Sequence, residues 1–219
     1  MESLLAATPA VTIRSVSVSD LDNNVYLLTA SQSGHQVLID AADDPVAIGR
    51  LLGSADGDAP EPKLSLIITT HSHFDHVRAL APLVQATGVS TLAGAEDALA
   101  IQDRTGVRIA RGLKHGDQVG VPGLELSVIA LRGHTPGSIA LAYRETGQPT
   151  HLFTGDSLFP GGVGNTDHDP ERFRRLMTDV VRRVFANFDD ATIVHPGHGA
   201  PTTLGAERPS LEEWWARGW

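Results

Sequence analysis

Cysteine is absent from the 219-residue sequence, which excludes disulfides, thiolate metal ligands and a cysteine nucleophile. Long apolar runs are absent too, since no stretch approaches the roughly 20 residues that a membrane-spanning helix needs. The N-terminus carries an acid at Glu2 and lacks the basic start and long apolar core of a signal peptide. We therefore expect a soluble protein that has no membrane partner and resides in the cytoplasm.

Basic residues are in deficit, with 17 Lys and Arg against 26 Asp and Glu and a formal net charge of −9. A surface that binds nucleic-acid phosphates needs a basic face, so this balance argues against a nucleic acid as partner. Charged residues at 20% and apolar residues at 41% are typical of a folded globular protein. The length suffices for a large core and no long linker divides the chain, so we expect a single domain over residues 1–219.

The most informative stretch is residues 70–76, which follow the apolar run 64–69. That run is short and β-branched and predicts a buried strand. Four metal-competent side chains crowd the end of this strand: His71, His73, Asp75 and His76. Any one histidine would be an ordinary polar residue, but three imidazoles and a carboxylate packed together without a cation leave polar groups that are costly to desolvate. The cluster therefore predicts a metal site.

The spacing within this cluster indicates more than one ion. In an extended segment, residues i and i+2 point to the same side, so His71 and His73 can face one ion. Asp75 and His76 lie where the chain turns before an expected helix over 77–87, and they can face a second ion nearby. Imidazole and carboxylate ligands suit zinc, iron or manganese.

Three further polar residues lie in the same kind of place, a glycine-flanked loop directly after a predicted strand. They are His134, Asp156 and His198. Glycine lets the backbone approach closely, and strand ends at one sheet edge converge. We therefore expect all three to meet the turn at residues 71–76.

The rest of the chain indicates an α/β protein. Strands are expected at 11–18, 25–28, 36–40, 90–93, 117–121, 124–131, 138–143, 151–153 and 191–194, and helices at 45–52, 77–87, 96–102 and from Pro170, with Asp169 as N-cap. Segments poor in helix flank a more helical middle. This arrangement suggests two stacked sheets with helices outside, although the pattern alone leaves other α/β layouts open.

Four motifs carry a family resemblance: His71-X-His73-X-Asp75-His76, Gly133-His134-Thr135-Pro136-Gly137, Thr154-Gly155-Asp156 and Pro196-Gly197-His198-Gly199. Together they resemble the metallo-β-lactamase superfamily in its glyoxalase II-like (hydroxyacylglutathione hydrolase-like) branch, over residues 24–203. The resemblance implies a four-layer αβ/βα sandwich with a two-metal centre. It implies one ion held by His71, His73 and His134, a second held by Asp75, His76 and His198, and Asp156 bridging both. His195 is then a neighbour of the site rather than a ligand, and its role is ambiguous.

Two ions a few ångströms apart can share a water and lower its pKa, which supplies hydroxide near neutral pH. We therefore expect a binuclear metal-dependent hydrolase in which a metal-bridged hydroxide attacks a thioester or ester carbonyl. The cofactors expected are two divalent metal ions, zinc first and iron or manganese as alternatives, with Asp75 and Asp156 as the catalytic carboxylates. A thiolate leaves without a proton donor, and no extra acid is visible near the motifs, which favours a small-molecule thioester or activated ester.

Several departures from the resembled branch bear on the substrate. Ser138 stands where a second histidine is usual, and Val163 and Asn165 stand where cysteine and arginine are usual. Only a short tail follows His198, so we expect the C-terminal helical domain that holds glutathione in that branch to be missing, and the thiol carrier stays open. Residues 211–219, rich in tryptophan, are expected to pack over the edge of the core, with lining a substrate groove as the alternative.

Other functions stay open. A mononuclear iron enzyme of the persulfide dioxygenase type and a lactonase belong to the same superfamily, and Asn165 in place of arginine counts against the former. A flavodiiron-type redox protein would need a flavin domain for which the chain has no room, and a nuclease is disfavoured by charge. A non-catalytic metal-binding module is the alternative that is not an enzyme. The oligomeric state is left open.

Overall fold

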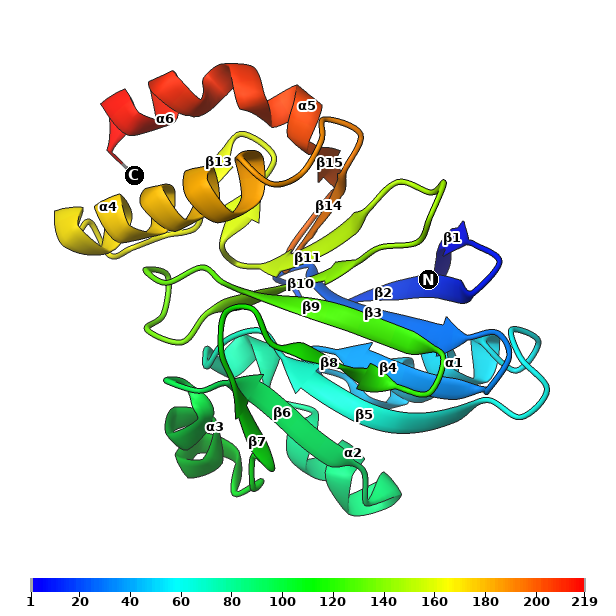
Figure 1. Ribbon diagram of the computed structural model, residues 1–219. Helices are drawn as coiled ribbons and strands as arrows, with labels where there is room; N and C mark the ends of the chain where they lie inside the picture. The colour runs from blue at the N-terminus through cyan, green and yellow to red at the C-terminus, as the bar shows by residue number, and fades with distance from the viewer. Residues whose placement is uncertain (1, 219) are drawn as a thin grey trace.

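The computed structural model of the protein describes residues 2–218, which contain two large sheets with helices on their outer faces (Figure 1). The first sheet has seven strands, which lie side by side in chain order. They are β1 (Ser3–Ala7), β2 (Val11–Val18), β3 (Asn23–Ala30), β4 (His35–Ile39), β5 (Lys63–Thr69), β6 (Ser90–Gly94) and β7 (Arg111–Leu113). Strands β1 to β4 pair antiparallel, and β4 to β7 pair parallel.

The second sheet has six strands in the order β15-β14-β11-β10-β9-β8. They are β8 (Gln118–Val121), β9 (Leu124–Ala130), β10 (Ile139–Tyr143), β11 (His151–Gly155), β14 (Ile193–Pro196) and β15 (Thr202–Thr203). Only β11 and β14 pair parallel in this sheet. Two short strands, β12 (Leu158–Phe159) and β13 (Gly162–Val163), form a separate hairpin.

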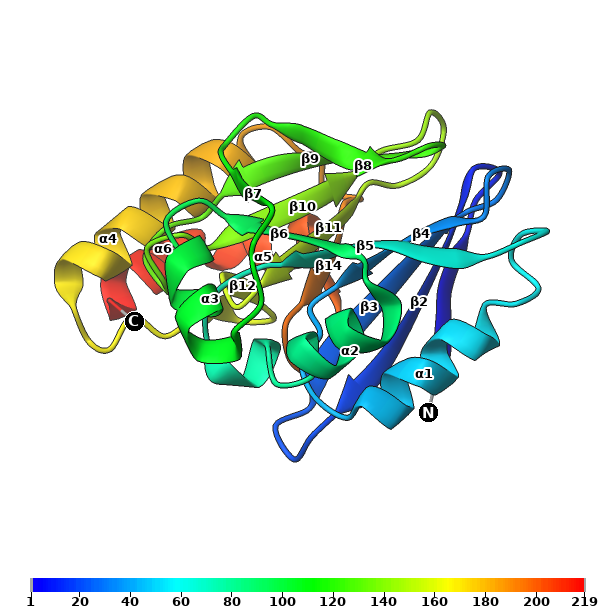
Figure 2. The same ribbon diagram turned by 90° about the horizontal axis from the view of Figure 1, so that it is seen from below.

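Helices cover the outside of each sheet (Figures 1 and 2). The first sheet carries α1 (Pro45–Ser54), α2 (Leu80–Thr87) and α3 (Ala98–Thr105), and the second carries α4 (Pro170–Asp179), α5 (Leu204–Glu207) and α6 (Leu211–Arg217). Short helical turns complete the chain: the 3₁₀ turns η1 (Phe74–His76) and η3 (Arg208–Ser210) and the π-helical η2 (Val180–Phe185). Within residues 2–218, none of these helices combines the length and apolar character that crossing a bilayer requires.

Three apolar clusters separate the four layers. Ile48 of α1 packs with Leu27 in a cluster between the first three helices and the first sheet. Leu28, the next residue of β3, points the other way and packs with Phe153 between the two sheets. A third cluster, which includes Leu176 of α4, lies between the second sheet and the C-terminal helices. The alternation of Leu27 and Leu28 follows from the pleat, in which successive side chains leave opposite faces. The predicted four-layer sandwich is confirmed.

Local sequence signals mark several helix ends as expected. Asp44 caps α1 by accepting hydrogen bonds from the backbone N–H groups of Val46 and Ala47, and Pro45 occupies the first turn. Asp169 caps α4 in the same manner. Gly88 ends α2 with a φ of 67°, in the left-handed region where glycine carries no Cβ penalty. These caps fix where the helices leave their sheets.

Other boundaries differ from the prediction. The helix expected from residue 77 begins only at Leu80, because the chain first makes the 3₁₀ turn η1 and its exit at the predicted metal site. The last long helix does not stay α-helical, since it continues beyond Asp179 as the π-helical η2. The edge strands β1 and β7 were not expected from the sequence. Both are short, and β1 is largely exposed, so neither shows clear apolar alternation.

The tryptophan-rich tail packs against the core, as expected. Trp214 of α6 is only 1% exposed and lies with its ring 6.4 Å from that of Phe185 in the outer cluster of the second sheet. Its neighbour Trp215 is 41% exposed and meets Phe173 edge to face. Trp219, the last residue of the predicted segment, lies outside the described residues. The tail thus contributes one buried anchor to the layer formed by α4.

Candidate metal centre

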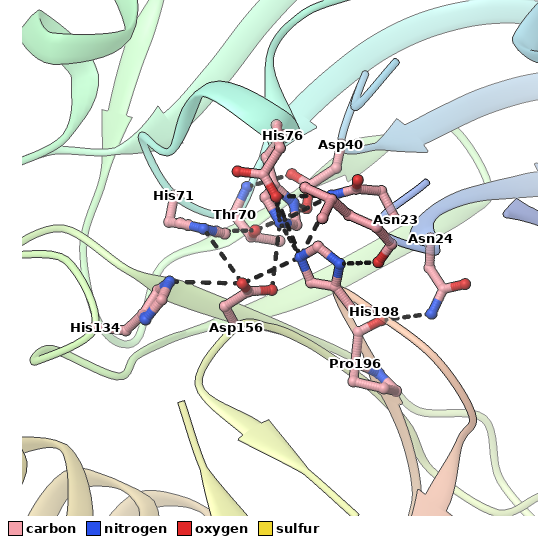
Figure 3. Close-up of polar contacts among 12 residues, drawn as sticks. Asn23, Asn24, Asp40, Thr70, His71, His76, His134, Asp156, Pro196 and His198 are labelled. Carbon is pink, nitrogen blue, oxygen red and sulfur yellow. Dashed lines mark hydrogen bonds and ion pairs between the residues drawn. The ribbon is translucent and has the colours of Figure 1, made fainter. Parts of the chain in front are cut away.

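All seven predicted ligands lie at one edge of the two sheets, on segments that directly follow strands. Figure 3 labels His71, His76, His134, Asp156 and His198 among them. Strand β5 is central in the first sheet and buried over its last four residues, so the turn after it is held firmly. That turn includes η1, and the loops after β9, β11 and β14 supply the other residues. In chain order the set is His71, His73, Asp75, His76, His134, Asp156 and His198.

Six of these residues form two groups of three. Within each group the potential ligand atoms all lie within 4.8 Å of one another, which is close enough for one ion to contact all three. The groups are His71, His73 and His134, and Asp75, His76 and His198. They coincide with the two ligand sets that the family resemblance implies.

Asp156 lies between the two groups. Its Oδ2 is 3.9 Å from Nε2 of His71 and 3.6 Å from Nε2 of His134, both in the first group. The same oxygen is 3.3 Å from Nε2 of His198, and Oδ1 is 3.3 Å from Nε2 of His76, both in the second. A carboxylate that reaches both groups can serve as a bridging ligand.

The imidazoles are oriented by hydrogen bonds on their outer nitrogens. In four rings Nδ1 lies against an oxygen, which leaves Nε2 pointing at the centre of the cluster. The pairs are His71 with Oγ1 of Thr70 at 3.0 Å, His76 with Oδ2 of Asp40 at 2.9 Å, His134 with the carbonyl of Asn165 at 2.7 Å and His198 with the carbonyl of Leu21 at 2.7 Å. Because Nδ1 donates in each pair, Nε2 keeps its lone pair, as a metal ligand must.

Asp40 also lies close enough to His71 and His76 to form a third possible group. Its oxygens are already used, however, since Oδ1 accepts from the backbone N–H of Thr70 at 2.7 Å. Oδ2 accepts from Oγ1 of Thr70 at 2.8 Å and from Nδ1 of His76. Asp40 therefore supports the ligands from behind. The sequence analysis placed this residue only at the end of the strand expected over 36–40, although that position resembles those of the other site residues.

Three buried polar atoms at the centre have no hydrogen-bond partner among the described residues. They are Nε2 of His71, Nε2 of His134 and Oδ1 of Asp156. Leaving such atoms unpaired costs about 1–3 kcal/mol each, so native proteins seldom do it without a ligand. All three face the space between the two groups, and their chemistry is that of zinc, iron or manganese ligands. The residues present therefore fit a bound metal.

The charges in the cluster also fit a cation site. Burial lowers the pKa of His71 well below its ordinary value, so this imidazole stays neutral. Burial also opposes ionisation of Asp156, but the nearby imidazoles of His198 and His76 outweigh it and hold the pKa of this carboxyl far below its usual range. For His76, burial is outweighed by the carboxylates of Asp156 and Asp40, which raise its pKa to about 10. In the absence of another cation, a proton on His76 balances these acids.

Asn23 is a contributor that the sequence analysis missed, because it belongs to none of the four motifs and precedes the strand expected at 25–28. Asn23 is fully buried, and its Nδ2 donates to Oδ2 of Asp75 at 3.0 Å. Asn24 lies beside it at the start of β3 and donates to the carbonyls of Pro196 and Gly199. The two side chains thus tie the second ligand group to the first sheet.

Asp97 is a second buried acid near the site that the sequence did not reveal. It accepts hydrogen bonds from the backbone N–H groups of Ser72 and Gly137 and from Oγ1 of Thr135. The expectation of no further acid near the motifs was therefore wrong, since Asp40 and Asp97 both lie there. Both carboxylates are engaged by donors from the surrounding loops. Neither is available as a free proton donor.

Ser138, which replaces a usual histidine, is buried and accepts from the backbone N–H of Thr135 at 3.0 Å. This hydrogen bond stabilises the loop that carries Ser138.

His195 lies apart from the ligand groups, since its Nε2 is 2.9 Å from Nδ1 of His151 and its ring stacks on Phe153. The remaining histidines, His35, His115, His151 and His168, belong to none of the three possible groups in the described part of the chain.

Comparison with known proteins agrees with this geometry. The family model described as "Metallo-beta-lactamase superfamily" matches residues 18–199. Hydroxyacylglutathione hydrolase from Pseudomonas savastanoi pv. phaseolicola is 33% identical over 178 residues, which cover 81% of this chain and 62% of that enzyme. The chain thus spans less than two thirds of that relative.

Two solved structures are also similar. TTHA1623 in a di-iron-bound form is 32% identical with a TM-score of 0.67, and the match covers 89% of this chain and 96% of that one. ETHE1 from Myxococcus xanthus is 25% identical with a TM-score of 0.76, covering 93% of this chain and 84% of that one. Both likenesses extend over nearly the whole chain.

Proposed function

Because the chain belongs to the metallo-beta-lactamase superfamily and is a hydrolase, we propose that it hydrolyses a thioester or ester with two divalent metal ions. The observation that carries this proposal is the position of Asp156, whose carboxylate lies between two groups of three potential ligands. We propose His71, His73 and His134 as ligands of one ion, Asp75, His76 and His198 as ligands of the other, and Asp156 as the bridge. The di-iron-bound form of TTHA1623 supports a centre of two ions.

When bound, two such ions lower the pKa of a shared water and polarise a carbonyl oxygen. The protein's own residues would orient the reacting groups and set their charges. Asp75 has its Oδ2 held by a hydrogen bond from Asn23, and we propose that this carboxylate would orient the attacking water as well as bind metal. Asp156 stays ionised at the centre, and the neutral Nε2 atoms of His71 and His134 face it.

The surroundings of the site favour a leaving group that needs no protonation. Asp40 and Asp97, the two further acids nearby, are held by hydrogen bonds from Thr70, His76 and the loops around Ser72 and Thr135. A thiolate departs without a proton donor, whereas an amine normally requires one. This supports a thioester or activated ester as substrate. The relative named for hydroxyacylglutathione is longer than this chain, so the thiol carrier stays part of the proposal to be tested.

The identity of the metal and of the substrate can be tested together. We expect elemental analysis of the purified protein to find two divalent ions per chain, zinc first and iron or manganese as alternatives. A panel of thioesters, activated esters, lactones and persulfides should show metal-dependent hydrolysis of a thioester or ester. If the metal-loaded protein hydrolysed no member of the panel, the proposal would be wrong.

A variant pair separates chemistry from folding. The side chain of His73 is half-buried and makes no hydrogen bond among the described residues, so His73→Ala should leave the fold intact while lowering kcat/KM by about a thousandfold or more. His35→Ala is the control, because His35 lies at the start of β4, at the opposite end of the strand from the site. Circular dichroism and metal content should be measured beside activity for both variants.

The second candidate function is a mononuclear iron enzyme of the persulfide dioxygenase type, with which the likeness to ETHE1 is compatible. One iron per chain, together with oxygen consumption on a persulfide, would favour this alternative over the hydrolase. The carbonyl of Asn165, at the position where arginine is usual in the resembled branch, orients His134.

A further inference from the structure

A hollow of about 440 Å³ opens beside the first ligand group. It is lined by His73 and His134 on one side and by Arg172 and Arg175 of α4 on the other. A substrate whose carbonyl lies at the metal centre would extend part of itself into this space. The chemistry of the two arginines therefore bears on what that part of the substrate is.

Each nitrogen of the Arg172 guanidinium donates a hydrogen bond within the protein. Its Nε donates to the carbonyl of Gly133 at 2.8 Å, one terminal nitrogen donates to the carbonyl of His134, and the other pairs with Asp167. This guanidinium holds the loop that carries His134 and neutralises the carboxylate of Asp167. With its charge paired and each of its nitrogens already donating, this guanidinium is less available to a ligand than that of Arg175.

Arg175 differs in that its guanidinium has no hydrogen bond and no ion pair within residues 2–218. It lies three residues after Arg172 on α4, so both side chains leave the same face of the helix, toward the hollow. With Asp167 already paired, the lining keeps one uncompensated positive charge. That charge lies next to a centre at which we propose two further cations, in a chain whose net charge is −9.

We propose that Arg175 binds a carboxylate of the substrate, so that the thioester or ester hydrolysed carries a negative charge on either its acyl or its thiol part. This rests on the proposed hydrolase function and narrows its substrate class. A guanidinium matches the planar carboxylate with two parallel hydrogen bonds, which gives orientation as well as affinity. Such a contact would fix the carbonyl relative to His73 and His134.

Three thioesters of similar size test the proposal and locate the charge. The glutaryl thioester of N-acetylcysteamine is charged on the acyl part, the hexanoyl thioester of mercaptopropionate is charged on the thiol part, and the hexanoyl thioester of N-acetylcysteamine is neutral. We expect the wild type to prefer one charged thioester over the neutral one. In Arg175→Gln, kcat/KM for that thioester should fall about tenfold, mainly through KM, with no change for the neutral thioester.

Arg174→Gln is the matched control. Arg174 is the neighbouring arginine on α4, is exposed, and does not line the hollow, so its substitution makes the same change in net charge. This variant should keep the wild-type preference. Equal rates on charged and neutral thioesters in the wild type, or equal losses in the two variants, would overturn the assignment of Arg175.

A binding measurement keeps this test independent of catalysis. Non-hydrolysable thioether analogues of the three compounds should be titrated calorimetrically into chelator-treated protein, in which the carboxylate has no metal to bind. The charged analogue should bind the wild type and Arg174→Gln about tenfold more tightly than it binds Arg175→Gln. If the wild type hydrolyses none of the thioesters but shows this difference, the proposed reaction fails and the carboxylate site stands. If the wild type hydrolyses the thioesters but substitution of Arg175 has no effect, the proposed reaction stands and the carboxylate site at Arg175 is wrong.

Discussion

Asp40 accepts a hydrogen bond from Nδ1 of His76 at 2.9 Å, and both side chains are buried. The same carboxylate also receives the backbone N–H and the hydroxyl of Thr70, whose oxygen in turn meets Nδ1 of His71. One residue at the end of β4 therefore orients imidazoles of both ligand groups. Loss of a partner of this kind typically weakens metal binding by about 10- to 100-fold.

Asp40→Asn should weaken metal binding about 10- to 100-fold, because the neutral amide is a poorer acceptor for Nδ1 of His76. Asp40 has a φ of 58°, and asparagine tolerates this left-handed conformation, so the backbone should persist. Competition with a chromogenic chelator measures the affinity. The control is Asp43→Asn, because Asp43 is a partly exposed acid that pairs with Arg78 away from the ligands. Unchanged affinity in Asp40→Asn would show that the carboxylate does not support the ligands.

Removal of the metal should destabilise the protein, because the unpaired Nε2 atoms of His71 and His134 then stay buried without a partner. At a free metal concentration a thousand times Kd, binding adds about 4 kcal/mol to the free energy of unfolding. Calorimetric melting of chelated protein, with and without added zinc, measures this gain. The His73→Ala variant should gain less. A Tm that does not respond to zinc, iron or manganese would contradict the metal centre.

Stability should also fall in acid through His195, whose pKa is lowered to about 3 by burial and by the neighbouring His151. Between about pH 6.5 and pH 3 the unfolded chain binds a proton at this position that the folded chain does not bind. The free energy of unfolding therefore decreases as pH falls through this window, by up to about 1.4 kcal/mol per pH unit.

His195→Gln tests this in chelated protein, because glutamine can keep a hydrogen bond to His151 but does not titrate. Urea unfolding from pH 7 to pH 4 should give a shallower pH dependence than in the wild type. His168→Gln, at an exposed histidine, should keep the wild-type slope. Identical slopes in all three proteins would mean that His195 is not held neutral in the fold.

The two adjacent tryptophans of α6 should differ in their effect on stability. Trp214→Ala removes a buried ring that packs on Phe185 and should lower the free energy of unfolding by about 3–5 kcal/mol. Trp215→Ala removes a partly exposed ring and should cost much less. Denaturant unfolding of both variants measures the difference. Equal losses would indicate that the tail is not anchored through Trp214.

Much of the fold followed from local patterns. The strands around residues 11–18, 64–69 and 124–131 were predictable because each shows clear apolar character over its length. The ends of α1 and α4 were predictable because Asp44 and Asp169 satisfy the first backbone N–H groups themselves. The late start of α2 was not, since the turn at η1 depends on contacts with distant strands. The π-helical η2 likewise continues an unbroken helical pattern and has no local signal.

The sequence by itself determined which side chains meet at the site, because each potential ligand lies in a short motif at the end of a strand. Only the tertiary structure decided how those side chains are aimed. The acceptors for Nδ1 of His76, His134 and His198 come from Asp40, Asn165 and Leu21, which are 31 or more residues away along the chain. Two of those acceptors are backbone carbonyls, which every residue possesses, so no residue type marks them in the sequence. The sequence also does not distinguish Arg175 from Arg172. Only the structure shows that Arg172 donates to the loop of His134, whereas the guanidinium of Arg175 makes no hydrogen bond or ion pair among the described residues.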